Sequence, residues 1–102
     1  MKVFLSPLAD HKIQLLLDYL EFNWSAKSRA DFLLKLSKSF NQISKQPRSC
    51  PESAEFPNLY KCILTKQTSY FYRIMSDEIE VITLIDNRQD PDEMAKELKH
   101  WR

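Results

Sequence analysis

The first part of the chain places hydrophobic residues with the period of an α-helix. Residues 2–5 form a short apolar run, which predicts a strand and stops at Ser6-Pro7. That pair favours a helix start, because Ser6 can cap the helix and proline at the first helical position loses no hydrogen bond. The apolar residues that follow lie on one stripe: Ile13, Leu16, Leu17, Leu20 and Trp24. Their spacing predicts an amphipathic helix.

A second helical pattern begins after Asn23-Trp24-Ser25 interrupts the first. Ser25 can cap this helix, which must end before Pro47 because proline disfavours helical geometry in the residue before it. The apolar positions again recur every three or four residues: Ala26, Ala30, Leu33, Leu36, Phe40 and Ile43. Two amphipathic helices joined by a tight turn predict a helical hairpin.

After the second helix the pattern changes from helical to strand-like. Residues 46–58 carry three prolines and scattered serines, which indicates an ordered surface loop. Three segments rich in β-branched and aromatic residues follow: 59–64, 69–75 and 79–85. The connections between them are short enough for antiparallel hairpins.

The last of these strands carries apolar residues on both sides. Strict alternation places one set on one side (Ile79, Val81 and Ile85) and a second set on the other (Ile82 and Leu84). This predicts a central strand that is covered, at least in part, on both faces.

The end of the chain predicts a short helix. Residues 90–93 (Asp-Pro-Asp-Glu) form a capping-box arrangement, and an apolar stripe follows: Met94, Leu98 and Trp101. With 102 residues, the chain has room for one core, so we expect a single domain over 1–102. The predicted fold is α+β, with a helical hairpin packed on a small twisted antiparallel sheet, the first strand beside the later ones, and a short C-terminal helix.

Composition excludes several classes of protein. The chain has no glycine, so a glycine-rich phosphate loop of the P-loop or Rossmann type is not possible. No apolar stretch approaches the roughly 20 residues of a membrane helix, and the N-terminus does not resemble a secretory signal. Cys50 and Cys62 are too few for a disulfide framework or a metal site. We expect a cytoplasmic protein with two reduced thiols, no metal and no cofactor.

The formal net charge of +1 hides an asymmetry. Residues 25–48 hold six basic side chains against one acid, and residues 77–98 hold eight acids against two basic side chains. A basic middle segment can attract an acidic partner or a polyanion, whereas the acidic end would repel a polyanion. Two ordinary solvated faces explain the same asymmetry, so charge alone does not select a function.

Several segments together resemble the RelE/ParE superfamily, the toxins of type II toxin–antitoxin systems and plasmid stabilisation systems. Residues 70–74 (Tyr-Phe-Tyr-Arg-Ile) and 80–91 (Glu-Val-Ile-Thr-Leu-Ile-Asp-Asn-Arg-Gln-Asp-Pro) resemble the end of that family's sheet. Residues 3–9 resemble its first strand and helix start. Pro47 and residues 59–61 (Leu-Tyr-Lys) stand where the family has its post-hairpin proline and its basic second strand.

The resemblance implies a toxin held inactive by a cognate antitoxin, which would cover the partly apolar sheet face opposite the helices. RelE-type toxins enter the ribosomal decoding site and cut messenger RNA, whereas ParE-type toxins block DNA gyrase. Operator DNA would be reached only through the antitoxin. The main expectation is a toxin that arrests growth by acting on translation or on DNA gyrase. Two alternatives stay open. One is a ribosome-dependent mRNA endonuclease, and the other is a non-toxic, repurposed member that acts only as a binding module.

By position in the family, the candidate catalytic residues are Lys61, Arg73 and Arg88. Cleavage by the RNA's own 2′-hydroxyl needs positive charge at the phosphorane and groups that move protons. Strands about 5 Å apart could bring three cations to one phosphate. In the alternative interpretation, Arg73 and Arg88 pair with nearby acids such as Asp86 or Asp90 and organise the end of the sheet.

One departure from the family pattern leaves open whether the protein is an enzyme. Ribonucleolytic members usually carry a tyrosine or histidine just after the last strand, but residues 89–93 read Gln-Asp-Pro-Asp-Glu. Acids there would repel a phosphate backbone. His11 and His100 are expected on helix surfaces. The aromatic residues 70–72 are expected to pack in the core rather than to stack on bases.

Overall fold

The computed structural model describes residues 1–87 of the chain. The elements follow in the order β1 (Lys2–Leu5), α1 (Pro7–Asn23), α2 (Ala26–Lys45), β2 (Tyr60–Ile63), β3 (Thr68–Ile74) and β4 (Glu78–Asp86). This is the α+β order that the sequence predicts. The expected C-terminal helix lies outside the described residues. Within residues 1–87, no helix combines the length and the apolarity needed to cross a membrane.

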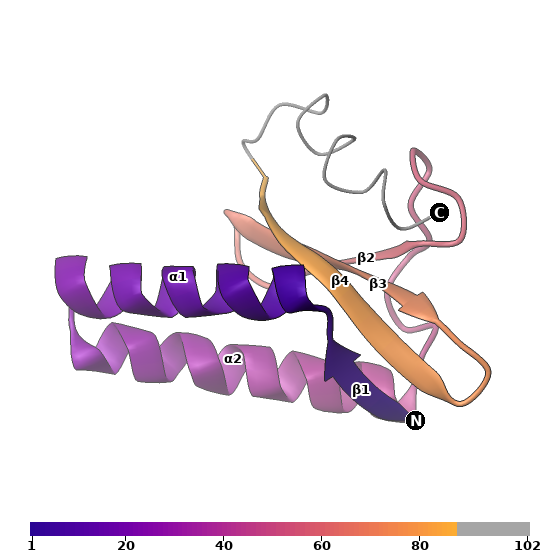
Figure 1. Ribbon diagram of the computed structural model, residues 1–102, viewed down its shortest axis with the longest axis horizontal. Coiled ribbons are helices and arrows are strands. Elements are labelled where there is room, and N and C mark those ends of the chain that lie inside the picture. The colour runs from indigo at the N-terminus through magenta and orange to yellow at the C-terminus, as the bar shows by residue number, and fades with distance from the viewer. Residues whose placement is uncertain (88–102) are drawn as a thin grey trace.

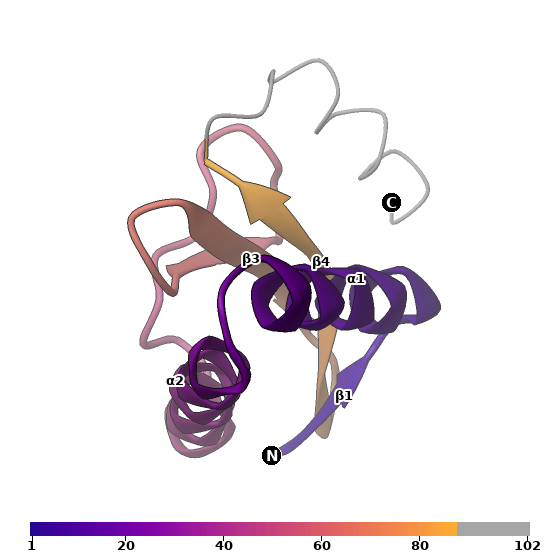
Figure 2. The same cartoon turned by 90° about the vertical axis from the view of Figure 1, so that its left-hand side faces the viewer.

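The four strands form one sheet in the order β1-β4-β3-β2, with the helical hairpin against one face (Figures 1 and 2). β3 runs antiparallel to both β2 and β4, whereas β1 runs parallel to β4. The sheet is therefore mostly antiparallel rather than wholly so. The parallel pair is possible because the chain leaves β1 through the whole hairpin, which supplies the long crossover that parallel strands need.

Both helices begin at the predicted caps. The Oγ of Ser6 accepts a hydrogen bond from the Ala9 N–H at 3.0 Å and donates one to the carbonyl of Ile82 at 2.6 Å. Ser6 therefore joins the start of α1 to the central strand β4. The Oγ of Ser25 accepts from the Ser28 N–H at 3.0 Å and caps α2. α2 ends at Lys45, two residues before Pro47, as predicted.

The main core lies between the hairpin and the sheet. It contains residues from both helices and from the two central strands: Ala9, Ile13, Leu17, Phe32, Leu36, Ile43, Tyr70, Tyr72, Ile79, Val81 and Leu84. Four positions of the predicted stripes are wrong: Ala26 and Ala30 are exposed, Trp24 is 72% exposed and Leu33 is 41% exposed. Trp24 lies in the turn between the helices, where the hairpin projects beyond the sheet (Figure 1). On α2, Phe32 is buried in place of its neighbour Leu33.

A β-bulge changes the alternation along β4. Phe71 lies opposite Thr83 but Tyr72 lies opposite Val81, so Ile82 is an extra residue on β4. Consequently Leu84 belongs to the core under the helices, while Ile82 and Ile85 pack on the other face with Leu59, Phe71 and Phe56. The prediction that Ile85 shares a side with Val81 is therefore wrong. The prediction that β4 is covered on both faces is confirmed.

Candidate functional site

Two of the three candidate catalytic residues lie on the sheet face that the helices do not cover, here called the open face. Lys61 on β2 is opposite Phe71 on β3, and Arg73 on β3 is opposite Glu80 on β4. Opposed residues project to the same side, and alternate residues of one strand do so too. Lys61 and Arg73 therefore share the open face, on neighbouring strands. Arg88 lies outside the described residues.

Arg73 forms an ion pair within the sheet. Its Nε donates to Oε1 of Glu80 at 2.6 Å, and 36% of the Arg73 side chain and 8% of the Glu80 side chain are exposed. A nearly buried carboxylate needs such a partner, because burial without one is costly. Arg73 thus organises the sheet, as the structural alternative predicted, although its acid is Glu80 rather than Asp86 or Asp90.

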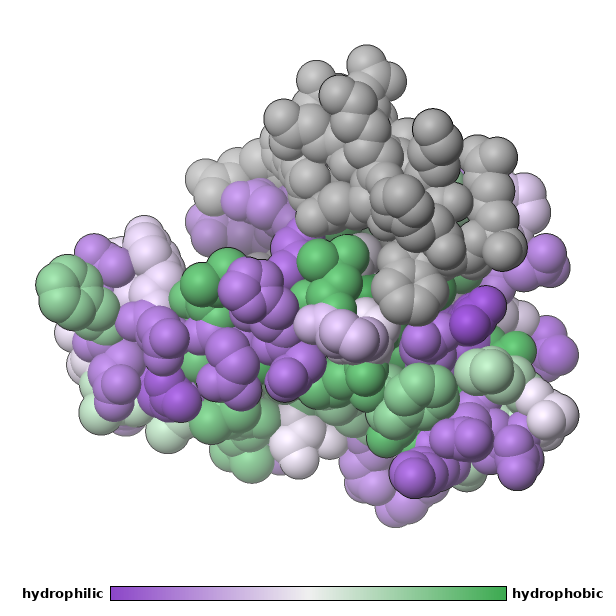
Figure 3. Space-filling model, in the orientation of Figure 1, coloured by the Kyte–Doolittle hydropathy of each residue, from purple (hydrophilic) through white to green (hydrophobic). Residues whose placement is uncertain are grey.

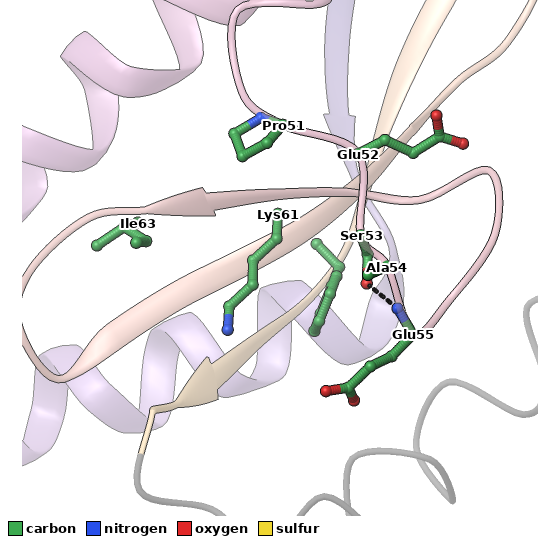
Figure 4. Close-up of a pocket in the computed structure, with 8 residues that line it drawn as sticks. Pro51, Glu52, Ser53, Ala54, Glu55, Lys61 and Ile63 are labelled. Carbon is green, nitrogen blue, oxygen red and sulfur yellow. Dashed lines mark hydrogen bonds between the residues drawn. The ribbon is translucent and has the colours of Figure 1, made fainter.

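Lys61 lies in a hollow of about 250 Å³ on the open face. β2 and β3 contribute Lys61, Ile63 and Phe71, and the proline-rich loop contributes residues 51–55 (Figure 4). The Lys61 amine makes no ion pair with any residue in the described part of the chain. Glu52 and Glu55 line the same hollow. The Glu52 side chain points away from Lys61 (Figure 4). The Glu55 carboxylate opposes the binding of a phosphate in the hollow, because it lowers the local positive potential.

The proline-rich loop is ordered and continues the sheet beyond β2. Glu52 pairs with Tyr60 in an isolated antiparallel bridge, and the Ser53 N–H donates to the Leu59 carbonyl at 2.7 Å. The Ser53 Oγ accepts from the N–H groups of Glu55 and Phe56, which holds the turn. The loop thus covers part of the edge of β2, and such cover protects an edge strand from unwanted pairing.

The tyrosines of β3 belong to the core and do not form a platform for bases. The Tyr70 hydroxyl hydrogen-bonds Ser39 Oγ at 2.8 Å, and the Tyr72 hydroxyl donates to the Pro47 carbonyl at 2.7 Å. Burial raises the pKa of both phenols well above the usual value. Neither is placed to stack on RNA or to transfer a proton at neutral pH. Phe71 packs in the cluster on the opposite face. The predicted packing role of this triplet is confirmed.

The helical hairpin carries large apolar side chains that are exposed. The sequence predicted apolar core stripes on these helices, but it did not predict an exposed apolar surface. We call this set the hairpin surface: Leu15, Tyr19, Phe22, Trp24, Leu33 and Leu34. Phe22 is 90% exposed. Figure 3 shows hydrophobic side chains at the free end of the hairpin, among polar ones. The spacing of Leu15, Tyr19 and Phe22 is a second helical stripe, which could have been found beside the core stripe.

The hairpin surface lies beside an ionic link between the two helices. Arg29 on α2 contacts the carboxylates of Asp18 at 3.3 Å and Glu21 at 3.7 Å on α1. Lys27, Lys35 and Lys38 on α2 are exposed. No set of three or more His, Cys, Asp or Glu side chains among residues 1–87 is arranged to hold a metal ion.

Comparison with known proteins agrees with this architecture. The model of a family described as the ParE toxin of the type II toxin–antitoxin system parDE matches residues 3–91. A solved structure described as the chromosomal ParDE TA system from P. aeruginosa superposes with a TM-score of 0.72, with 11% identity, over 84% of this chain and 95% of that chain. A copper-bound mutant toxin from Helicobacter pylori superposes with a TM-score of 0.59, with 17% identity, over 85% and 94%. No curated protein matches the sequence.

Proposed function

Because the chain belongs to the ParE toxin family of type II toxin–antitoxin systems, we propose that it arrests growth by binding and blocking DNA gyrase until a cognate antitoxin neutralises it. The Arg73–Glu80 ion pair is the observation that favours the blocking of gyrase over the cleavage of RNA. It removes one of the three expected cations from a phosphate site. A blocking toxin needs a binding surface and no proton-transfer group.

The other described side chains on and near the sheet also favour binding over cleavage. Lys61 shares its hollow with Glu55. The hydroxyls of Tyr70 and Tyr72 form hydrogen bonds on the helix side of the sheet. An RNA-cleaving site would need both a cluster of positive charge and an accessible acid or base. Among residues 1–87, Lys61 and Arg73 do not form such a cluster of charge, because Arg73 is paired with Glu80.

For the antitoxin we propose the hairpin surface as the main contact. Apolar side chains of the open face such as Phe71, Ile82 and Ile85 are already buried, so that face offers less apolar area than the sequence led us to expect. The hairpin surface instead exposes a helical stripe next to the lysines of α2. An acidic amphipathic helix fits it, because its apolar stripe and its charge would both be matched.

The target is tested by expressing the full chain under tight repression and by adding the purified protein to a gyrase supercoiling assay. We expect growth arrest and loss of supercoiling, with no new messenger RNA 5′ ends on induction. Lys61→Ala should arrest growth as the wild type does. Ribosome-dependent cleavage that Lys61→Ala abolishes would replace the gyrase proposal with the endonuclease alternative. A chain with no effect on growth would be a repurposed binding module.

The antitoxin is tested by co-expressing a short acidic reading frame that adjoins this gene. We expect relief of growth arrest and a complex of the two proteins that survives gel filtration. If arrest persists although the two proteins are both present and soluble, the neutralisation proposal is wrong.

A further inference from the structure

The two cysteines face each other across an antiparallel pair of segments. The bridge between Glu52 and Tyr60 sets the register between the loop and β2. The Lys61 N–H donates to the Pro51 carbonyl at 3.0 Å, which continues that register by one residue. One further step places Cys50 opposite Cys62. Nothing in the local sequence pattern brings them together, because this pairing depends on how the loop folds back.

The register also determines how close the pair is. Hydrogen bonds flank the Glu52–Tyr60 pair on both sides, at Ser53–Leu59 and at Lys61–Pro51. Glu52–Tyr60 is therefore a non-hydrogen-bonded pair, and alternation makes Cys50–Cys62 one as well. Such pairs have Cα atoms about 4.5 Å apart, within the range of roughly 4.4–6.8 Å that a disulfide spans.

The side chains agree with the backbone register. Both cysteines are free and half-buried, and the Cys62 thiol lies close enough to help raise the pKa of the Cys50 thiol. Ser39 Oγ contacts the Cys62 Sγ at 3.5 Å from α2, and the Tyr72 side chain on β3 lies near the Cys50 thiol. Both cysteines pack against the main core. The strand register and the shared core contacts therefore both place Cys50 beside Cys62.

We propose that Cys50 and Cys62 are a covalent modification site, which forms an intramolecular disulfide when the protein meets an oxidised low-molecular-weight disulfide. One protein thiolate attacks that reagent and displaces one of its thiolates, which gives a mixed disulfide. The second protein thiol then attacks the protein sulfur, loses its proton, and expels the other small thiolate. The protein loses two hydrogens and two electrons, and the reagent leaves as two thiols.

The environment makes this reaction slow at neutral pH. Burial, together with the neighbouring Cys62, raises the pKa of the Cys50 thiol to about 12. Because the thiolate is the nucleophile, oxidation accelerates as pH rises. The neutral hydroxyls of Ser39, Tyr70 and Tyr72 face the thiols from α2 and β3. The pair therefore remains reduced in a reducing compartment and closes under oxidative stress.

Closure would fix the open-face hollow. The disulfide would join the two ends of the segment 50–62, which carries the loop wall of the hollow and Lys61. A link that closes a loop of this length restricts the unfolded chain, and we expect a rise in Tm of about 5–15 °C.

The test is incubation of the full chain with oxidised glutathione at pH 8.5, followed by intact-mass analysis, tryptic mapping and thermal unfolding. We expect a mass lower by that of two hydrogens, the peptide 49–61 linked to 62–66, and the higher Tm, all reversed by dithiothreitol. Cys50→Ala and Cys62→Ala are the matched controls and should take up one glutathione each without a rise in Tm. Two stable glutathione adducts on the wild type, or disulfide-linked dimers only, would overturn the proposal.

Discussion

Arg73 on β3 and Glu80 on β4 lie directly opposite each other, and the Arg73 Nε donates to Oε1 of Glu80 at 2.6 Å. The carboxylate is almost buried while the guanidinium reaches the surface. The arginine that the family resemblance marks as catalytic therefore compensates a charge that the sheet encloses. This relationship decides how substitutions at the two positions should behave.

Arg73→Ala should lower the free energy of unfolding by about 1–3 kcal/mol, because the nearly buried carboxylate of Glu80 would lose its partner. The measurement is urea unfolding at pH 7. Lys66→Ala, at an exposed cation, is the control and should change stability by no more than about 0.5 kcal/mol. In the background of Glu80→Ala, removing Arg73 should cost less than it does alone. Equal costs in the two backgrounds would show that the pair contributes nothing.

Ser6→Ala should cost more stability than the equivalent change at the second cap. Ser6 is buried, and its hydroxyl bonds both the Ala9 N–H and the Ile82 carbonyl, so Ser6→Ala removes two buried hydrogen bonds. We expect a loss of about 2–3 kcal/mol for Ser6→Ala, against about 1 kcal/mol for Ser25→Ala at an exposed cap. Denaturant unfolding of both variants measures the difference. Similar losses would mean that the bond to Ile82 adds nothing.

Stability should fall as pH rises above about 10, the ordinary pKa of a phenol. Burial raises the pKa of Tyr70 and Tyr72 in the folded state, so above that pH the unfolded chain releases protons that the folded chain keeps. Proton release from the unfolded state favours unfolding, and below pH 9 these two groups should have no effect. Urea unfolding between pH 8 and 11 measures the slope.

The slope can be assigned by substitution. Tyr72→Phe removes one buried phenol and should make the alkaline loss of stability shallower, even if it lowers stability at pH 8. Ile79→Val is the control, because it also alters the buried core but carries no titrating group. A Tyr72→Phe variant with the wild-type slope would contradict the assignment.

Phe22→Ser should weaken binding of the cognate antitoxin about 10- to 100-fold, because exposed aromatic side chains are frequent anchors of protein interfaces. Since Phe22 is 90% exposed, its replacement should change the free energy of unfolding by no more than about 0.5 kcal/mol. Isothermal titration calorimetry measures affinity, with Gln14→Ala as an exposed polar control on α1. Unchanged affinity for Phe22→Ser, Tyr19→Ser and Leu15→Ser together would remove the hairpin surface as the antitoxin contact.

The sequence by itself determined the features that depend on near neighbours. The helix caps at Ser6 and Ser25 follow from local backbone chemistry. The end of the second helix before Pro47 has the same origin. The order of elements follows from the change of hydrophobic period after that proline. The family resemblance depends on the same short strings of residues, so it too is a property of the chain that needs no knowledge of strand pairing.

Only the tertiary structure decided the features that depend on strand register and on how the helices and strands pack against one another. The bulge at Phe71 and Tyr72 moves Ile85 to the open face, and the same register gives Arg73 the acid Glu80. The length of the hairpin relative to the sheet leaves Trp24 exposed. Pairing between strands joins residues far apart in sequence, and local patterns carry little information about which of them meet.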